Sequence, residues 1–284
     1  MVLKSINYWS FPGGLEGTLD IGEFMSKAKG YGFDAVELSI GETGALGLDA
    51  DQAYCENILK QAEQIGIKVA SLCSGIYWSY SLASDSTADR DKASAALEKM
   101  IRIASWLKVR TLLTIPGAVS VFFMPDRPVI SYDVIKQRAT EGIYKMLPVA
   151  NDCGVVMAIE NVWNKFLLSP IEMSDFIDSF NNPSVGAYVD VANMIPYGYP
   201  EQWLRILGKR VAGIHFKDFR VDVGNINGFV DLLEGDVNWP EVMKAINEIG
   251  YNGAVVAEMI PQYRHYPEVR IANTSNAMNA ILGR

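Results

Sequence analysis

The sequence predicts an α/β protein: a (β/α)₈ TIM barrel that forms a single domain over residues 1–284. Three observations lead to this prediction. Strand-like and helix-like segments alternate along the whole chain, the apolar runs are short and bounded by turn signals, and no linker or change in composition divides the chain. A doubly wound sheet would rarely need eight βα units. The absence of a G-x-G-x-x-G turn after the first strand also weakens a dinucleotide-binding alternative.

The strand candidates are short runs of six or seven residues, rich in β-branched and other apolar side chains, as expected of parallel strands buried on both faces. In chain order they are KSINYW, FDAVEL, GIKVASL, VRTLLTI, GVVMAIE, SVGAYVD, RVAGIHF and GAVVAE.

Amphipathic stretches between these runs predict the helices. Seven of them lie near residues 20–30, 49–65, 86–107, 132–152, 171–180, 200–207 and 240–249. Junctions such as EQIGIKVAS and NDCGVVMAIE recur, each with a glycine that can end a helix in the left-handed conformation directly before a strand. The recurrence indicates repeats of one βα unit.

Composition excludes several classes of protein. The net charge of −8 argues against a nucleic-acid surface, which needs clustered Lys and Arg. No apolar stretch approaches the length of a membrane span or a signal peptide, so we expect a cytoplasmic protein without a membrane partner. Cys55, Cys73 and Cys153 are too scattered for a disulfide framework and are expected to be buried small side chains. The sequence leaves a homo-oligomer open.

Four successive strands in the second half of the chain end in metal-ligand side chains: Glu160, Asp190, His215 and Glu258. The active site of such a barrel lies at the carboxyl ends of its strands. Three carboxylates and one imidazole suit one divalent ion, such as Mn²⁺, Mg²⁺, Co²⁺ or Zn²⁺, and vicinal oxygens of a sugar could complete its coordination.

The two glutamates stand at the ends of this half-ring, so we expect them to flank a chelated substrate from opposite sides. An ion that polarises a carbonyl makes the neighbouring carbon easier to deprotonate, through an enediolate. With Glu160 and Glu258 on opposite faces, a proton removed from one face is returned to the other, which is epimerisation. An aldose–ketose isomerase would need one base working along a single face.

These residues carry a resemblance. The Glu…Asp…His…Glu pattern, with DVAN, HFKD and GDVNWPEVMKAINEIGYNGAVVAEM around the last three ligands, resembles the xylose isomerase-like sugar phosphate isomerase/epimerase superfamily over essentially the whole chain. Within it the chain is similar to D-tagatose/D-psicose 3-epimerases and L-ribulose-5-phosphate 3-epimerases. The resemblance implies an enzyme of carbohydrate metabolism that acts on a ketose or ketose phosphate. It also implies that the four ligands bind Mn²⁺ or a similar ion, and that Glu160 and Glu258 exchange the C3 proton.

Two positions depart from the free-ketose branch. Asn193 stands where those epimerases usually carry a histidine, and Phe166 stands where they tend to have a second glutamate. The DVAN and HFKD strings are closer to the ribulose-phosphate branch.

Further residues are expected to contact the substrate. Lys217 points to the same side of its strand as His215 and could neutralise enediolate charge. Arg220, with Lys217 or Lys165, could hold a phosphate. The other substrate-binding candidates, which follow or end strands, are Asn193, Glu37, Trp163 and Tyr8.

Other functions use the same kind of site. A hydroxypyruvate isomerase-like aldose–ketose isomerase and an inosose dehydratase-like lyase share the single-metal ligands. A non-catalytic sugar-binding module would need a broken ligand set, whereas all four ligands are present. A trinuclear DNA-repair endonuclease needs more than two histidines and a basic face.

Overall fold

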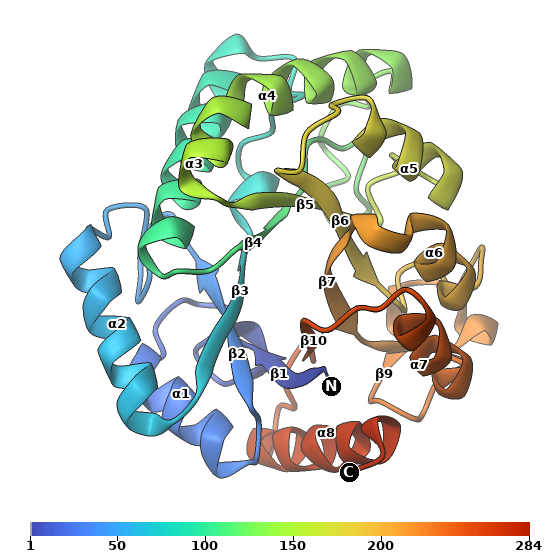
Figure 1. Ribbon diagram of the computed structural model, residues 1–284. Helices are drawn as coiled ribbons and strands as arrows, with labels where there is room; N and C mark the ends of the chain where they lie inside the picture. Colours follow the sequence, from blue (N-terminus) through green and yellow to red (C-terminus); the bar gives the residue numbers. More distant parts are fainter. Residues whose placement is uncertain (1) are drawn as a thin grey trace.

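The computed structural model describes residues 2–284, which form a closed barrel of eight parallel strands surrounded by helices (Figure 1). The barrel strands are β1 (Leu3–Asn7), β2 (Ala35–Ile40), β3 (Lys68–Ser74), β4 (Thr111–Thr114), β5 (Val156–Glu160), β6 (Val185–Asp190), β7 (Val211–Phe216) and β10 (Ala254–Ala257). Strands that follow one another along the chain are neighbours, and β1 pairs with both β2 and β10, which closes the barrel. The predicted fold class is confirmed.

The helices are α1 (Ile21–Gly30), α2 (Gln52–Ile65), α3 (Thr87–Trp106), α4 (Tyr132–Cys153), α5 (Pro170–Asp178), α6 (Pro200–Leu207), α7 (Trp239–Glu248) and α8 (Pro267–Leu282). The first seven match the predicted ranges within a few residues. No range was predicted for α8. Its buried positions include Arg270, Thr274 and Ser275 beside Ile271 and Met278, so polar residues interrupt the apolar stripe by which the other helices are recognised.

Glycines end two of the helices as predicted. Gly66 follows α2 with φ 73° and Gly154 follows α4 with φ 66°, and each backbone N–H returns to a carbonyl of the last helical turn. Glycine adopts this left-handed conformation without a Cβ penalty. The chain therefore leaves each helix and turns directly into the next strand.

The first strand is shorter than predicted. β1 ends at Asn7, whereas the run KSINYW placed Tyr8 and Trp9 in the strand. The Asn7 side chain accepts the backbone N–H of Trp9 at 2.7 Å, and a short 3₁₀ turn, η1 (Tyr8–Ser10), begins there. An asparagine that caps its own following turn competes with the strand ladder.

The long loop after β7 contains a small hairpin that was not predicted, formed by β8 (Asp218–Phe219) and β9 (Phe229–Val230). The buried carboxylate of Asp218 organises this loop. It accepts the backbone N–H groups of Phe219, Leu233 and Val237 and the indole N–H of Trp239, at 2.9–3.2 Å. One side chain thus holds three separate segments of the loop against the barrel.

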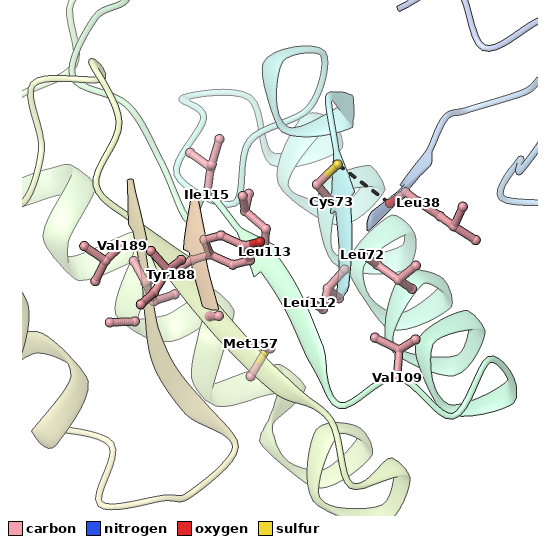
Figure 2. Close-up of a cluster of buried hydrophobic side chains, with 14 of the residues drawn as sticks. Leu38, Leu72, Cys73, Val109, Leu112, Leu113, Ile115, Met157, Tyr188 and Val189 are labelled. Atoms are coloured by element: carbon pink, nitrogen blue, oxygen red, sulfur yellow. Dashed lines mark hydrogen bonds between the residues drawn. The ribbon is translucent and has the colours of Figure 1, made fainter. Parts of the chain in front are cut away.

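The core lies inside the barrel and between the barrel and its helices. Figure 2 shows part of it, with Leu72, Leu112 and Met157 from successive strands and the Cys73 thiol directed at the carbonyl of Leu38, 3.7 Å away. The three cysteines are free thiols. Cys55 and Cys73 are buried as predicted, whereas Cys153, at the end of α4, is half-buried. None of the helices within residues 2–284 combines the length and the apolar character needed to cross a bilayer.

Candidate metal centre

Four ligand-type side chains stand at the carboxyl ends of four neighbouring strands. β5 ends at Glu160 and β6 at Asp190, His215 lies one residue before the end of β7, and Glu258 directly follows β10. These strands are consecutive in the barrel, and the register pairs Asp190 with His215. Because parallel strands present their carboxyl ends at one edge, the side chains converge, and one donor atom from each lies within 4.8 Å of the others. The predicted half-ring is present.

The atoms that face this common space fit a cation. Asp190 Oδ2, His215 Nδ1 and Glu258 Oε2 are buried and make no hydrogen bond, although the first and last have Lys217 as an ion-pair partner. His215 Nδ1 lies 3.5 Å from Glu160 Oε1 and 3.4 Å from Glu258 Oε2. A buried polar atom without a partner, such as His215 Nδ1, is costly, and a divalent ion would satisfy it together with the carboxylate oxygens beside it. The carboxylate and imidazole donors suit an oxygen-preferring or borderline ion.

Lys217 points into the same space, as its position two residues after His215 predicts. Its Nζ lies 2.9 Å from Asp190 Oδ2, forms an ion pair with Glu258, and stands 5.7 Å from the centre of the Phe229 ring. Burial alone would lower the pKa of Lys217, but the carboxylates of Asp190 and Glu258 raise it above its usual range. The ammonium therefore remains charged at neutral pH.

Two of the ligand side chains have shifted proton affinities. Burial raises the pKa of Glu160 to about 6, against the opposing effect of His215. An ion that binds Glu160 therefore competes with this proton. Burial lowers the pKa of His215, but the carboxylates of Glu37 and Glu258 raise it by more, so an ion that binds Nδ1 displaces a proton.

Glu37 does not lie where a sugar could reach it, contrary to expectation. Its side chain on β2 is fully buried inside the barrel, and both oxygens accept hydrogen bonds, Oε1 from Asn7 and Oε2 from Ser71 and Tyr188. Oε1 also lies 2.7 Å from His215 Nε2. Burial alone would raise the pKa of Glu37, but His215 and the hydroxyl donors lower it to about 2. Glu37 is therefore an anion held behind His215.

Asn193 hydrogen-bonds to a second asparagine, Asn161, which was not predicted as a site residue from the sequence. Asn161, directly after β5, donates from Nδ2 to the carbonyl of Asp190 and accepts the N–H of Asp190 at Oδ1, at 2.9 and 2.8 Å. Asn193 donates from Nδ2 to the carbonyl of Asn161, and its own N–H donates to Asp190 Oδ1. The two amides fix the ligand Asp190 in place. The one feature of the sequence that could have identified Asn161 is its position directly after Glu160.

Trp163 lies beside this pair, at the wall of a cavity of about 440 Å³. Its indole N–H donates to the carbonyl of Asn193 at 2.7 Å, and its ring packs against Phe219 and Phe229, with centroids 5.5 and 5.3 Å away. Lys165 also lines this cavity, together with Asn161, Asn193, Phe122 and Tyr197. The cavity is thus adjacent to the Glu160 and Asp190 side of the metal centre.

Tyr8 and Arg220 do not lie where they were expected to contact a sugar. Tyr8 is buried and its hydroxyl donates to the carbonyl of Leu19, although the residue also lines a second cavity of about 360 Å³ after β1, β2 and β3. Arg220 Nε donates to the carbonyl of Glu234 at 2.8 Å, and its guanidinium lies 3.7 Å from the Glu234 carboxylate. The Arg220 side chain is 53% exposed and lines neither cavity. The structure therefore does not bring Arg220 into the site.

The chain is similar to known sugar epimerases. It is 26% identical over 256 residues to SgbU of Escherichia coli (strain K12), whose name gives L-ribulose-5-phosphate 3-epimerase as a provisional activity, covering 88% of this chain and 87% of SgbU. It is 22% identical over 265 residues to the L-ribulose-5-phosphate 3-epimerase UlaE of Salmonella typhi, covering 92% and 90% of the two chains. A crystal structure of D-psicose 3-epimerase in the presence of D-fructose superimposes with a TM-score of 0.78 at 20% identity, over the full length of both chains.

The family assignment comes from the sequence itself. Residues 25–278, most of the chain, match the family described as xylose isomerase-like TIM barrel. The closed barrel and the half-ring of strand-end ligands agree with that match. The chain therefore belongs to the xylose isomerase-like TIM barrel family.

Proposed function

We propose that this protein is a metal-dependent ketose 3-epimerase that exchanges the C3 proton through an enediolate. It is an enzyme of the sugar epimerase and isomerase type, as its relatives are, and the family contains ketose 3-epimerases of both phosphorylated and free sugars. The observation that supports the proposal best is that His215 Nδ1 lies between two carboxylates, those of Glu160 and Glu258, which come from opposite ends of the half-ring.

The proposed roles follow from this arrangement. A divalent ion held by Glu160, Asp190, His215 and Glu258 would polarise the ketose carbonyl and stabilise negative charge on its oxygen. Glu160 and Glu258 then act on the two faces of C3, one removing the proton and the other supplying a proton to the opposite face. The ammonium of Lys217, charged and beside both Asp190 and Glu258, lowers the energy of the enediolate.

The substrate side of the site is proposed from the cavities. Asn193 and Trp163 line the larger one and would contact the sugar there, with Lys165 as the basic side chain within reach of a phosphate. Which sugar is turned over is decided by assaying the purified protein with Mn²⁺ against free and 5-phosphorylated ketoses, reading proton exchange in D₂O. We expect exchange at C3. Exchange at C1 without C3 would identify an aldose–ketose isomerase instead.

The two-base mechanism is tested with Glu160→Gln and Glu258→Gln. Glutamine keeps an oxygen ligand but lacks a basic carboxylate, so in each variant that still binds metal net epimerisation should fall about 10²-fold or more. One variant should still exchange C3 deuterium from D₂O into one epimer only, and the other variant should show the reverse preference. Glu63→Gln, on the exposed face of α2, is the matched control and should retain full activity.

The outcome that contradicts two bases is equally specific. If both variants retain metal, and one loses exchange with both epimers while the other keeps exchange with both, a single base acts, and the isomerase reaction becomes the better description. Metal content measured on each variant separates this outcome from loss of the ion.

A further inference from the structure

A cluster of buried polar side chains lies beneath the candidate metal centre, and its hydrogen bonds determine which ring nitrogen of His215 carries the hydrogen. Glu37 lies on β2, three strands away from β7 around the barrel, and its side chain reaches through the interior to His215. Its carboxylate oxygens have four polar partners at 2.6–2.7 Å: His215 Nε2, Asn7 Nδ2, the Ser71 hydroxyl and the Tyr188 hydroxyl. All five side chains are buried, so water does not compete for these contacts.

The donor and acceptor roles are fixed by the partners. A carboxylate only accepts hydrogen bonds, so the hydrogen between it and the imidazole must be on Nε2. The amide of Asn7 cannot be reversed, because its Oδ1 already accepts the backbone N–H of Trp9. Oε1 of Glu37 is thus restricted to the acceptor role toward His215.

The other ring nitrogen faces the ligands. His215 Nδ1 makes no hydrogen bond and lies within 3.5 Å of carboxylate oxygens of both Glu160 and Glu258. A neutral imidazole with its hydrogen on Nε2 has its lone pair on Nδ1, the atom that would bind an ion. Partners that orient a ligand histidine in this way also increase its basicity.

We propose that Glu37 is a positioning residue that holds His215 with its hydrogen on Nε2 and thereby presents Nδ1 to the metal ion. Glu37 itself contacts neither ion nor sugar. The inference rests on the metal site of the proposed function and is independent of which ketose is the substrate.

The first test measures metal affinity. We expect Glu37→Gln, which keeps an oxygen acceptor but removes the charge, to raise the Kd for Mn²⁺ measured by titration calorimetry about 10-fold to 100-fold, the usual effect of losing a partner of a ligand. Tyr188→Phe is the matched control, because it removes a hydrogen bond to Glu37 Oε2 without altering the contact with His215. Its Kd should stay within about threefold of the wild-type value.

The second test reads the hydrogen bond directly. The chain has two histidines, His215 and the exposed His265, so the imidazole region of a long-range ¹H–¹⁵N spectrum contains two rings, and a His265→Gln variant assigns them. With Zn²⁺ bound, the wild-type His215 ring should carry its hydrogen on Nε2 at a strongly downfield shift. That signal should move upfield in Glu37→Gln and remain in place in Tyr188→Phe.

Three results would overturn the proposal. One is a Glu37→Gln variant that binds Mn²⁺ as tightly as the wild type, and another is a Zn²⁺-bound wild-type protein whose His215 ring lacks a hydrogen on Nε2. The third is a wild-type protein that binds no divalent ion, which would also remove the metal site from the proposed function. The first two results would leave the epimerase proposal standing.

Discussion

Gly213 shows how a single missing side chain shapes the site. It lies two residues before His215 on β7, and a Cβ at this position would lie 2.5 Å from Cε2 of Tyr188. The Tyr188 ring in turn packs against the His215 ring, with centroids 4.5 Å apart, and its hydroxyl donates to Glu37. Glycine here makes room for the tyrosine that supports the histidine.

We therefore expect Gly213→Ala to destabilise the protein by about 1–3 kcal/mol, the usual cost of overpacking a buried position. Urea unfolding monitored by circular dichroism measures this difference. In the Gly213→Ala, Tyr188→Phe double variant the ring still occupies the same volume, so most of the loss should remain. A Gly213→Ala variant as stable as the wild type would show that the barrel interior adapts to the extra methyl group.

At the same scale, the sequence predicted the four ligands but not what supports them. Glu160, Asp190, His215 and Glu258 could be identified because each ends an apolar run, and strand ends of a parallel barrel meet. Glu37 was also expected at a strand end and therefore at the sugar, but β2 continues three residues beyond it to Ile40, so its side chain lies inside the barrel. There His215, three strands away around the barrel, supplies a partner that no spacing within β2 reveals.

At the scale of whole elements, contacts between the segment after α8 and the first two strands link the two ends of the chain. Arg284, after α8, donates to Asp34 Oδ2, and the same oxygen accepts the backbone N–H of Lys4 at 2.9 Å. Burial alone would raise the pKa of Asp34, but Arg284 and the Lys4 N–H lower it below its usual value. The ionised form of Asp34 is thus stabilised in the folded protein.

A pH dependence follows. Because the folded pKa of Asp34 is depressed, its contribution to stability is complete above the unfolded pKa of about 4 and is lost as the pH falls through the folded value. Asp34→Asn should cost less than about 1 kcal/mol at pH 7, since the pair is partly exposed, and progressively less as the pH falls below about 4 and the carboxylate becomes protonated. Unfolding free energies of both proteins, measured at pH 7 and at a series of lower pH values, check this. A difference that grows on acidification would contradict the assigned sign.

Element boundaries were predictable where local chemistry decided them. Gly66 and Gly154 end α2 and α4 as their sequence context indicates. The β8–β9 hairpin and α8 were not predicted, because long-range contacts define them. Asp218 accepts hydrogen bonds from backbone groups as far along the chain as Val237. α8 buries polar side chains that hydrogen-bond to β1, such as Ser275, whose hydroxyl accepts a hydrogen bond from the ammonium of Lys4.

At the scale of the whole molecule, a bound ion should stabilise the fold. Ligands that bind only the folded state add about 2.7 kcal/mol at 100 times their Kd, which for a chain of this size corresponds to a rise in Tm of about 4–6 °C. We expect this rise when Mn²⁺ is added to the metal-free protein, and its reversal by EDTA, in differential scanning fluorimetry.

The two histidines provide the control. His215→Ala should abolish the rise, whereas His265→Ala, at an exposed loop position, should leave it unchanged. An equal rise in both variants would place the ion elsewhere in the protein.

Alternation of strands and helices predicted a parallel sheet, because right-handed βαβ connections bring successive strands side by side. The choice of a closed barrel over a doubly wound sheet depended on the presence of eight βα units without a G-x-G-x-x-G turn.

All four candidate ligands lie on β5, β6, β7 and β10, which form one half of the barrel mouth, so the two halves differ in what they contribute to the site. The loops that follow β1, β2, β3 and β4 carry none of the four. The first three border the second cavity, and Trp78 after β3 packs against Phe123 after β4. Insertions or exchanges in the loops after β1, β2 and β3 would change the wall of the smaller cavity and leave the four strand-end side chains in place. Natural drift or laboratory recombination can therefore reshape one side of the barrel mouth while the candidate metal ligands are inherited intact.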